Sequence, residues 1–547
     1  MVEAPITPIC KRNALISVLL LGLASPAWAA ARPDDLAAYL KARAAEADGH
    51  VAGAVTDYAA AMAADPGNQD IAIRAYRAAL DAGDYALADR ALASLQRAGV
   101  APPDSAIVSL ADAIHAGDKR AASAAIDRME GSPLAFMLPV FKAWQAYDDG
   151  DKDPIAALSD KNSASIGRRY EAENRALLLI ATGKADDGIA AVRALLGPDQ
   201  ASFDFRVAAA QLLAGQGKQA LAQSLLGGDD PVLGALRSTL GDGVKPSLAF
   251  GASRLFDRLA SDLGHGEPSP LTIVLTRSAL RIDPHDDRAR LLLAQALEQE
   301  DATDLALAAL DGIDMNGPFA EIARSARVAV LSDAGRAAQA LAAAQALDVA
   351  PTATAEDAQR LGDAYVALDR YAEAAKAYDR AIARAGKAAD WSMYLQKGGA
   401  LDQAGNWPEA RAALQKAVEM APNEPLALNY LGYAEIEHGE DLVAAQKMLE
   451  KASALKPGDP AITDSLGWAY FKRGSPAKAL PLFERAVQGQ PADVTINEHL
   501  GDAYWKTGRF YEARYAWRAA AVNAEGKDKD RLLAKIENGL GAGPVEN

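Results

Sequence analysis

Cysteine is almost absent from this sequence, which has one, Cys10, among 547 residues. Cys10 lies before the apolar run at 14–24, so it would leave with a cleaved leader. It also does not directly follow that run, which is where a lipid-modified cysteine would have to stand. A chain without Cys10 has no disulfide, no thiolate nucleophile and no cysteine metal site.

Strand patterns and aromatic residues are scarce as well. No stretch alternates β-branched and polar residues over five or more positions, and aromatics make up 6 % of the chain. Apolar residues still reach 50 %, and alanine is prominent among them. We therefore predict an all-α fold. The length exceeds that of one usual core, which predicts several domains or one extended array.

Positive charge is in deficit, with 57 Lys and Arg against 73 Asp and Glu and a net charge of −16. Such a balance argues against duplex nucleic acid and anionic lipid as partners. We predict no nucleic-acid partner.

Catalytic motifs are missing too: the sequence has no H-E-x-x-H, no G-x-S-x-G and no phosphate-binding glycine loop. Glu435 and His438 have the spacing of half a carboxylate di-metal site, but a second such pair is lacking. We interpret them as surface residues of a helix. The sequence predicts no catalytic residue, no cofactor and no metal, and hence no enzyme.

The N-terminus has the features of a processed leader. Lys11 and Arg12 precede the apolar run, and Ala27 and Ala29 give a small-x-small cleavage pattern. We predict a signal peptide at 1–29, cleaved after Ala29 or Ala30, and export to the periplasm. The run is short for a membrane span, although an uncleaved anchor stays open. No transmembrane helix is expected after removal of the signal.

A repeat with a period of 34 or 35 residues dominates the C-terminal part of the chain. Its glycines are Gly398, Gly432, Gly467 and Gly501, and its first alanines are Ala410, Ala445, Ala479 and Ala513. A bulky residue follows each alanine by four positions: Leu414, Leu449, Phe483 and Trp517. Proline closes most units, at Pro422, Pro457 and Pro491.

This pattern predicts a helix hairpin. The repeat glycine and alanine let two helices approach closely, and the bulky residue fills the space beside that contact. A second set of glycines supplies the turns, at Gly405, Gly439, Gly474 and Gly508. Because one hairpin cannot bury its own apolar face, the units must stack into a solenoid.

The repeat resembles the tetratricopeptide repeat. The residues that carry the resemblance are Leu466, Gly467, Tyr470, Ala479, Phe483, Ala486 and Pro491. It implies a superhelix of stacked antiparallel helix pairs, in one array or two. The best units are predicted at 357–390, 391–424, 425–459, 460–493 and 494–526, within a C-terminal array at 267–526.

Outside these units the organisation is less regular. We predict a degenerate helical array at 30–227, an irregular connection or boundary at 228–266, a capping helix at 527–540 and a disordered tail at 541–547.

The resemblance also implies where a partner would dock, because the first helix of each repeat lines the concave groove in this family. The implied groove residues, together called the predicted docking surface, are Asn429, Tyr433, Ile436, Asp464, Trp468, Phe471, Lys472, Glu498, Asp502, Trp505 and Lys506. Large rings beside mixed charges suit a protein or peptide partner. The alternative is that these aromatics pack against the following unit or the capping helix. The family's carboxylate clamp is not matched, since Tyr433, Ala461 and Ser465 stand at clamp positions.

Segments such as 428–433, 464–470 and 497–505 are similar to those of large exported proteobacterial tetratricopeptide proteins, including the outer-membrane adaptor of a carboxyl-terminal processing protease. The similarity implies a non-catalytic scaffold or adaptor in the cell envelope, with a processing protease among its partners. Two alternatives stay open: a scaffold for cell-wall or outer-membrane biogenesis, and an enzyme with a site around 136–256.

Overall fold

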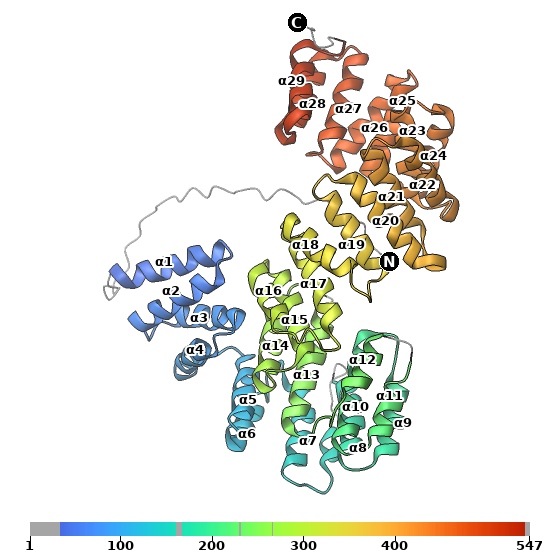
Figure 1. The fold of residues 1–547 in the computed structure, drawn as a ribbon. Coiled ribbons are helices and arrows are strands. Elements are labelled where there is room, and N and C mark those ends of the chain that lie inside the picture. Colours follow the sequence, from blue (N-terminus) through green and yellow to red (C-terminus); the bar gives the residue numbers. More distant parts are fainter. Residues whose placement is uncertain (1–32, 160–166, 229–230, 265, 542–547) are drawn as a thin grey trace. The chain divides into compact units, whose positions relative to one another are not determined.

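The computed structural model describes residues 33–159, 167–228, 231–264 and 266–541, and every regular element in these ranges is a helix (Figure 1). This confirms the all-α prediction. The predicted signal peptide, with Ala27 and Ala29, lies outside the described residues, as do residues 542–547 of the predicted tail. The chain divides into two compact units, one ending at Ser105 and the other starting at Ala106.

The first unit is a run of two helix hairpins. Its helices are α1 (Pro33–Ala47), α2 (Val51–Ala64), α3 (Gln69–Ala82) and α4 (Tyr85–Arg97). Each packs against the next along the chain. Asn68 and Asp84 cap the starts of α3 and α4 by accepting backbone N–H groups, and Gly83 ends α3 in the left-handed region at φ 78°. Side-chain caps and a glycine stop thus set this hairpin locally.

The second unit begins with α-helices of unequal length, from 7 to 16 residues, and with two short 3-10 helices. They are α5 (Ser105–His115), α6 (Lys119–Asp127), η1 (Ala135–Met137), α7 (Leu138–Asp148), η2 (Pro154–Ser159), α8 (Arg168–Ala181), α9 (Ala185–Leu195), α10 (Gln200–Gly215), α11 (Gln219–Leu225) and α12 (Pro231–Thr239). Further hairpins follow: α13 (Leu248–Leu263), α14 (Pro270–Ile282), α15 (Asp287–Gln299), α16 (Thr303–Asp311), α17 (Ala320–Asp333) and α18 (Ala337–Asp348).

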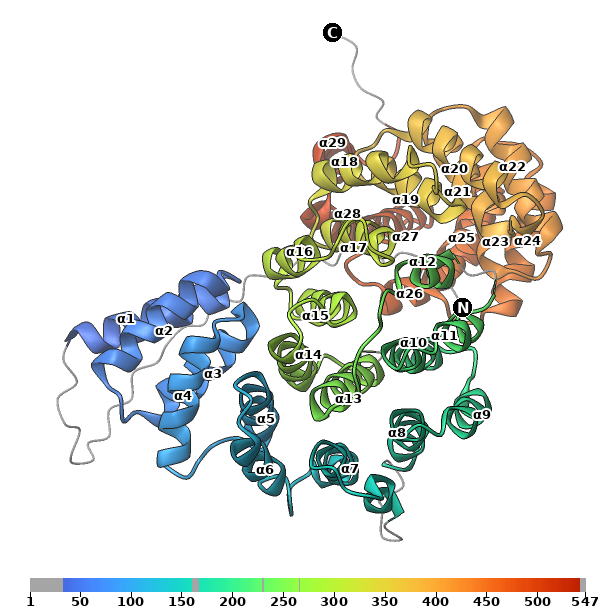
Figure 2. The same cartoon turned by 60° about the horizontal axis from the view of Figure 1, so that its bottom comes forward.

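The stretch 228–266, predicted as an irregular connection or boundary, contains α12 and α13 in its described part, and the division into two compact units falls between Ser105 and Ala106. α13 forms a hairpin with α14 and also packs against α7 and α10 (Figure 2). Gly251 makes this approach possible, since a Cβ there would lie 2.2 Å from Cδ1 of Trp144. α13 was not predicted from the sequence because glycine-rich turns precede it, although Leu255, Phe256 and Leu259 have helical spacing.

The regular array follows in register with the predicted repeat. Its helices are α19 (Ala355–Val366), α20 (Tyr371–Ala385), η3 (Gly386–Ala388), α21 (Trp391–Gln403), α22 (Trp407–Met420), α23 (Pro425–Glu437), α24 (Leu442–Leu455), α25 (Pro460–Lys472), α26 (Pro476–Gly489), α27 (Val494–Lys506) and α28 (Phe510–Asn523). The predicted turn glycines all have positive φ, between 68° and 82°. A Cβ on Gly467 would lie 2.8 Å from Cε1 of Phe483, which confirms the close helix contact. The last helix, α29 (Gly526–Asn538), lies where a capping helix was predicted.

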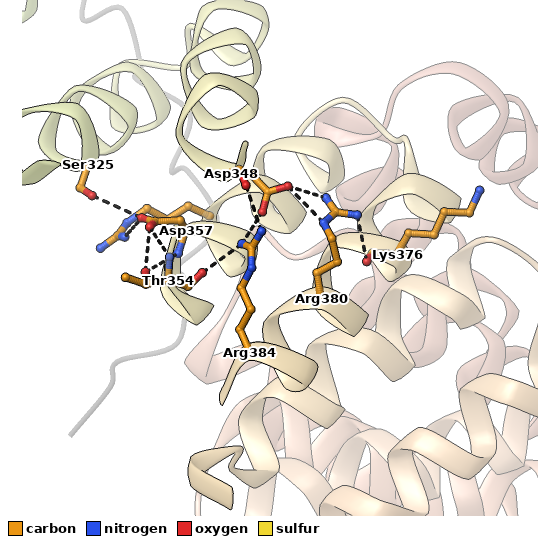
Figure 3. Close-up of polar contacts among 8 residues, drawn as sticks. Ser325, Asp348, Thr354, Asp357, Lys376, Arg380 and Arg384 are labelled. Carbon is orange, nitrogen blue, oxygen red and sulfur yellow. Dashed lines mark hydrogen bonds and ion pairs between the residues drawn. The ribbon is translucent and has the colours of Figure 1, made fainter. Parts of the chain in front are cut away.

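A polar cluster joins α18 to the first regular repeat (Figure 3). Asp348, which ends α18, is buried between Arg380 and Arg384 of α20. Its Oδ2 accepts a hydrogen bond from Nη2 of Arg380 at 2.9 Å, and its Oδ1 accepts one from Nη1 of Arg384 at 2.6 Å. Arg384 also donates to the carbonyl oxygen of Thr354 at 3.1 Å. The segment 349–354 is therefore held at both ends against α20.

Candidate functional site

The predicted docking surface lies on three first helices of successive repeats. α23 packs against α25, and α25 packs against α27. A carboxylate caps the start of each helix and accepts a backbone N–H of the first turn. The capping residues are Glu424, Asp459 and Asp493. A negative cap is favourable at the positive end of a helix. Local capping and repeat stacking together bring the predicted residues onto adjacent helices.

Trp468 of α25 links all three helices. Its Nε1 donates to Oε1 of Glu437 on α23 at 2.5 Å. Its ring stacks on His499 of α27, with centroids 3.8 Å apart, and on Phe471, with centroids 5.0 Å apart. The indole is only 9 % exposed, so packing engages most of it. Nζ of Lys472 lies 5.1 Å from the ring centroid, within the range of a cation–π contact.

His499 was not among the predicted site residues, yet it lies at the centre of this cluster. Its Nδ1 is 2.9 Å from Oδ2 of Asp464, and both residues are buried. Oδ1 of Asp464 accepts no hydrogen bond from the described residues. The sequence held one signal for this pair, because Asp464 and His499 are 35 residues apart, which is one repeat. The contact with Asp464 thus holds the imidazole of His499 in place against the indole of Trp468.

The third helix of the predicted surface is covered by α29. Glu498 accepts hydrogen bonds from Arg531 at 2.7 and 2.9 Å and lies 2.7 Å from Nζ of Lys535. Asp502 accepts one from Lys535 at 2.8 Å and one from Nε1 of Trp517 at 2.9 Å. Each acid precedes its basic partner by 33 residues, so α29 occupies the place of the next repeat's first helix.

The pKa values of the two acids are shifted in opposite directions. Burial alone would raise the pKa of Glu498, but the hydrogen bonds and charges of Arg531 and Lys535 outweigh it and bring the pKa to about 2. Burial raises the pKa of Asp502 above its ordinary value, although Lys535 opposes the shift. Glu498 is thus a strong anchor for α29, and both acids are engaged within the fold.

Trp505 also packs against the C-terminal helices. Its ring centroid lies 5.4 Å from that of Trp517 and 4.6 Å from that of Phe510. Gly539, just after α29, touches it closely, since a Cβ there would lie 2.0 Å from Cζ2 of Trp505. The indole stays partly exposed.

The predicted docking surface therefore divides by accessibility. Its buried members are Ile436, Asp464, Trp468, Glu498 and Asp502, and its accessible members are Asn429, Tyr433, Phe471, Lys472, Trp505 and Lys506. Oδ1 of Asn429 is buried and accepts no hydrogen bond from the described residues. Burial raises the pKa of Tyr433, so its phenol keeps its proton and can donate a hydrogen bond. We call the accessible residues on α23 and α25 the exposed docking surface; they are Asn429, Tyr433, Phe471 and Lys472.

Glu435 and His438 do not act as a pair. Glu435 is buried and accepts hydrogen bonds from Arg411 at 3.2 Å, which differs from the surface position expected of it. His438 stacks on Trp407 with centroids 4.0 Å apart and contacts Asp402 at 2.7 Å. Inter-repeat packing explains both residues. Among the described residues, no three His, Cys, Asp or Glu side chains are grouped as a metal site would require.

Comparison with known families identifies the regular array. Residues 360–425, 395–460 and 465–529 match the model of the tetratricopeptide repeat, so these parts of the chain are tetratricopeptide repeats. With the paired helices described above, this confirms a tetratricopeptide-type α-solenoid. Repeats of this family serve as protein-interaction scaffolds. No curated protein matches the chain.

Solved structures include similar helical arrays. A tetratricopeptide repeat protein from Parabacteroides merdae is 14 % identical, with a TM-score of 0.41, and the match covers 46 % of this chain and 99 % of that one. Yeast Tom70 is 14 % identical, with a TM-score of 0.35 and coverage of 74 % and 95 %. A thermophilic protein of the same repeat type from Thermus thermophilus is 21 % identical, with a TM-score of 0.30 and coverage of 34 % and 99 %. In the part of the chain that the structure describes, no helix is both long and apolar enough to cross a membrane.

Proposed function

We propose that this protein is a non-catalytic adaptor of the bacterial cell envelope that docks a partner protein or peptide on its exposed docking surface. The observation that carries the proposal is the adjacency of α23 and α25, which places Tyr433, Phe471 and Lys472 on neighbouring helices with partly exposed rings and a cation. Aromatic rings with a nearby cation are frequent energetic centres of interfaces.

The predicted leader at 1–29 supports a periplasmic location, and the similarity of the C-terminal segments makes a periplasmic processing protease the first partner to test. Scaffolding of cell-wall or outer-membrane biogenesis is the alternative within the same class. Export itself is tested by sequencing the N-terminus of the protein recovered from the periplasm. A chain starting at Ala30 or Ala31 supports it, an intact leader on a membrane-bound chain contradicts cleavage, and recovery of the chain from the cytoplasm alone contradicts export.

Site-specific photo-cross-linking tests the docking surface in cells. A photoreactive residue is placed at Tyr433 or Phe471, and in matched control chains at Tyr511 or Tyr515, two exposed tyrosines of α28. The proposal expects one protein to be cross-linked from the first two positions and not from the controls. Mass spectrometry of that product shows whether it is a processing protease. Equal cross-linking from all four positions would contradict the docking surface, and the absence of any product would contradict the adaptor itself.

A further inference from the structure

A cavity of about 460 Å³ lies in the second compact unit, away from the regular array. Its walls come from α10, α12 and the segment joining it to α13, the first turns of α13, and residues 282–288 and 314–319. Its volume is in the range of sites for small molecules. Stacking of regular repeats does not require such a space.

The walls of the cavity are held by close backbone contacts. The N–H of Val244 donates to the carbonyl oxygen of Gln211 on α10 at 3.0 Å. Gly243 lies so near α10 that a Cβ would come within 2.2 Å of the same oxygen. On the opposite side, the N–H of Asp314 donates to Oδ2 of Asp287 at 3.4 Å. The cavity is therefore a built part of the fold.

The lining combines an apolar wall with negative charge. Val207, Leu236, Phe250 and Phe319 supply the apolar wall. Five aspartates line the cavity: Asp204, Asp283, Asp286, Asp287 and Asp314. Asp287 forms an ion pair with Arg290 at 3.2 Å, and two arginines of the lining engage Asp204 and Asp286, which leaves Asp283 and Asp314 without an ion pair among the described residues.

Both arginines of the lining are already engaged. Nη2 of Arg288 lies 2.8 Å from Oδ2 of Asp204, and Arg254 forms an ion pair with Asp286. Asp283 and Asp314 are exposed, and each accepts a backbone N–H two residues ahead, at 3.0 and 2.9 Å. These two exposed carboxylates line the cavity.

A buried carboxyl group, that of Asp257, lies behind the wall of the cavity. Asp257 is 4 % exposed, and neither of its oxygens accepts a hydrogen bond from the described residues. It lines a second cavity of about 30 Å³, which shares Asp204, Arg254 and Arg288 with the first. Arg254, 3.2 Å from Asp257, must therefore serve Asp257 and Asp286 together. Burial and the neighbouring Asp286 raise the pKa of Asp257 well above its ordinary value, which favours its neutral form, so the negative charge of the cavity comes from the aspartates of its own lining.

We propose that this cavity binds a small organic cation, an amine or guanidinium group carried on a short hydrocarbon chain. The hydrocarbon lies against Phe250 and Phe319, and the cationic head faces Asp283 and Asp314. The same chemistry can come from a free amine or from a lysine or arginine side chain of a bound protein.

Calorimetric titration of the signal-free chain tests this proposal. Cadaverine and agmatine are the free probes, 1-pentanol is the uncharged control, and a blocked Gly-Arg-Gly peptide represents a protein side chain. We expect saturable binding of the cations that weakens as salt is added, and no binding of 1-pentanol. Tighter binding of the peptide than of agmatine assigns the site to a protein side chain, and the reverse order assigns it to a free amine.

Two variants locate the binding. Ala249→Phe places a ring in the cavity and is expected to abolish binding while helicity and melting stay unchanged. The double variant Asp283→Asn, Asp314→Asn keeps both backbone acceptors but removes two charges, which is expected to weaken binding roughly three- to tenfold. The matched control Asp118→Asn, Asp390→Asn changes two helix caps elsewhere and should bind like the parent. Absence of cation binding at millimolar concentration, or undiminished binding by a folded Ala249→Phe chain, overturns the proposal.

Discussion

The imidazole of His499 lies on the indole of Trp468, with ring centroids 3.8 Å apart and planes inclined by 13°. The two residues belong to successive repeats, so the stack joins α25 to α27. The hydrogen bond from the same indole to Glu437 extends the link to α23. Trp468 was predicted as a docking residue, but its contacts give it a structural role that any binding experiment must separate from docking.

Trp468→Ala is expected to destabilise the regular array by about 3–5 kcal/mol, because it removes a buried indole and leaves a cavity between repeats. Phe471→Ala, at a partly exposed ring, should cost about 1 kcal/mol. The measurement is the urea midpoint followed by circular dichroism. Tyr511→Ala, at a ring 72 % exposed, is the control and should stay within about 0.5 kcal/mol of the parent. Equal effects at Trp468 and Tyr511 would contradict the packing described here.

Gly501→Ala is expected to destabilise the protein by about 1–3 kcal/mol, because the new Cβ would lie 2.4 Å from Cδ1 of Trp517. Gly53→Ala is the matched control in a helix, since the nearest neighbouring atom would be 3.7 Å from its Cβ. There, alanine should stabilise by up to about 1 kcal/mol through its helix propensity. Thermal melting of both variants shows whether each substitution stabilises or destabilises the protein. A stabilising Gly501→Ala would show that the repeat glycine is not needed for close helix contact.

The docking of α29 is expected to weaken in acid through Glu498. Its folded-state pKa of about 2 is below the unfolded value of about 4.3, so its contribution is complete above the unfolded value and is lost as the pH falls through about 2. Asp502, whose pKa is raised, works in the opposite direction and offsets part of the effect.

Glu498→Gln should therefore lower stability by about 2 kcal/mol at neutral pH, since charge-assisted hydrogen bonds to Arg531 are lost. The difference from the parent should shrink toward the acid end, where the parent's Glu498 is itself protonated. Urea midpoints of both chains across this range measure it, with Glu537→Gln, at an exposed site of α29, as control. A difference that does not change with pH would contradict the assignment.

Asp348→Asn is expected to loosen the junction between α18 and the regular array at a cost of about 1–2 kcal/mol, because a buried carboxylate partner of two arginines is lost. Hydrogen exchange should accelerate in residues 349–354 and in the last turns of α20. Asp379→Asn, which removes an exposed ion pair with Lys397, should change exchange little. Unchanged exchange in the Asp348 variant would show that backbone packing alone holds the junction.

The regular array could be predicted from the sequence because its packing rules act over short and repeated separations. Gly467 meets Phe483 16 residues later, and Gly501 meets Trp517 at the same separation. The same contact geometry recurs in each unit, so the residues that form it appear as a periodic pattern in the sequence. The burial of Leu414, Leu449, Phe483 and Trp517 followed from that pattern and is confirmed.

The accessibility of the docking residues could not be read in the same way. Repeat position placed Glu498 and Asp502 on the concave side, but α29 determines that they are buried. A helix with no consensus glycine or alanine pattern covers them, and only the matching charges of Arg531 and Lys535 indicate it. Repeat position therefore predicts where a residue lies on its helix, and the neighbouring element decides whether a partner can reach it.

The sequence by itself determined the helical class, the repeat length and the hairpin turns, since each depends on residues within about one repeat of each other. Only the tertiary structure decided the packing of α13 and the cavity beside it. Their contacts join residues such as Asp204 and Arg288, which are 84 positions apart, and Tyr170 and Asp262, which are 92 apart. Contacts of this kind occur once, between helices of unequal length, and so leave no periodic signal in the sequence.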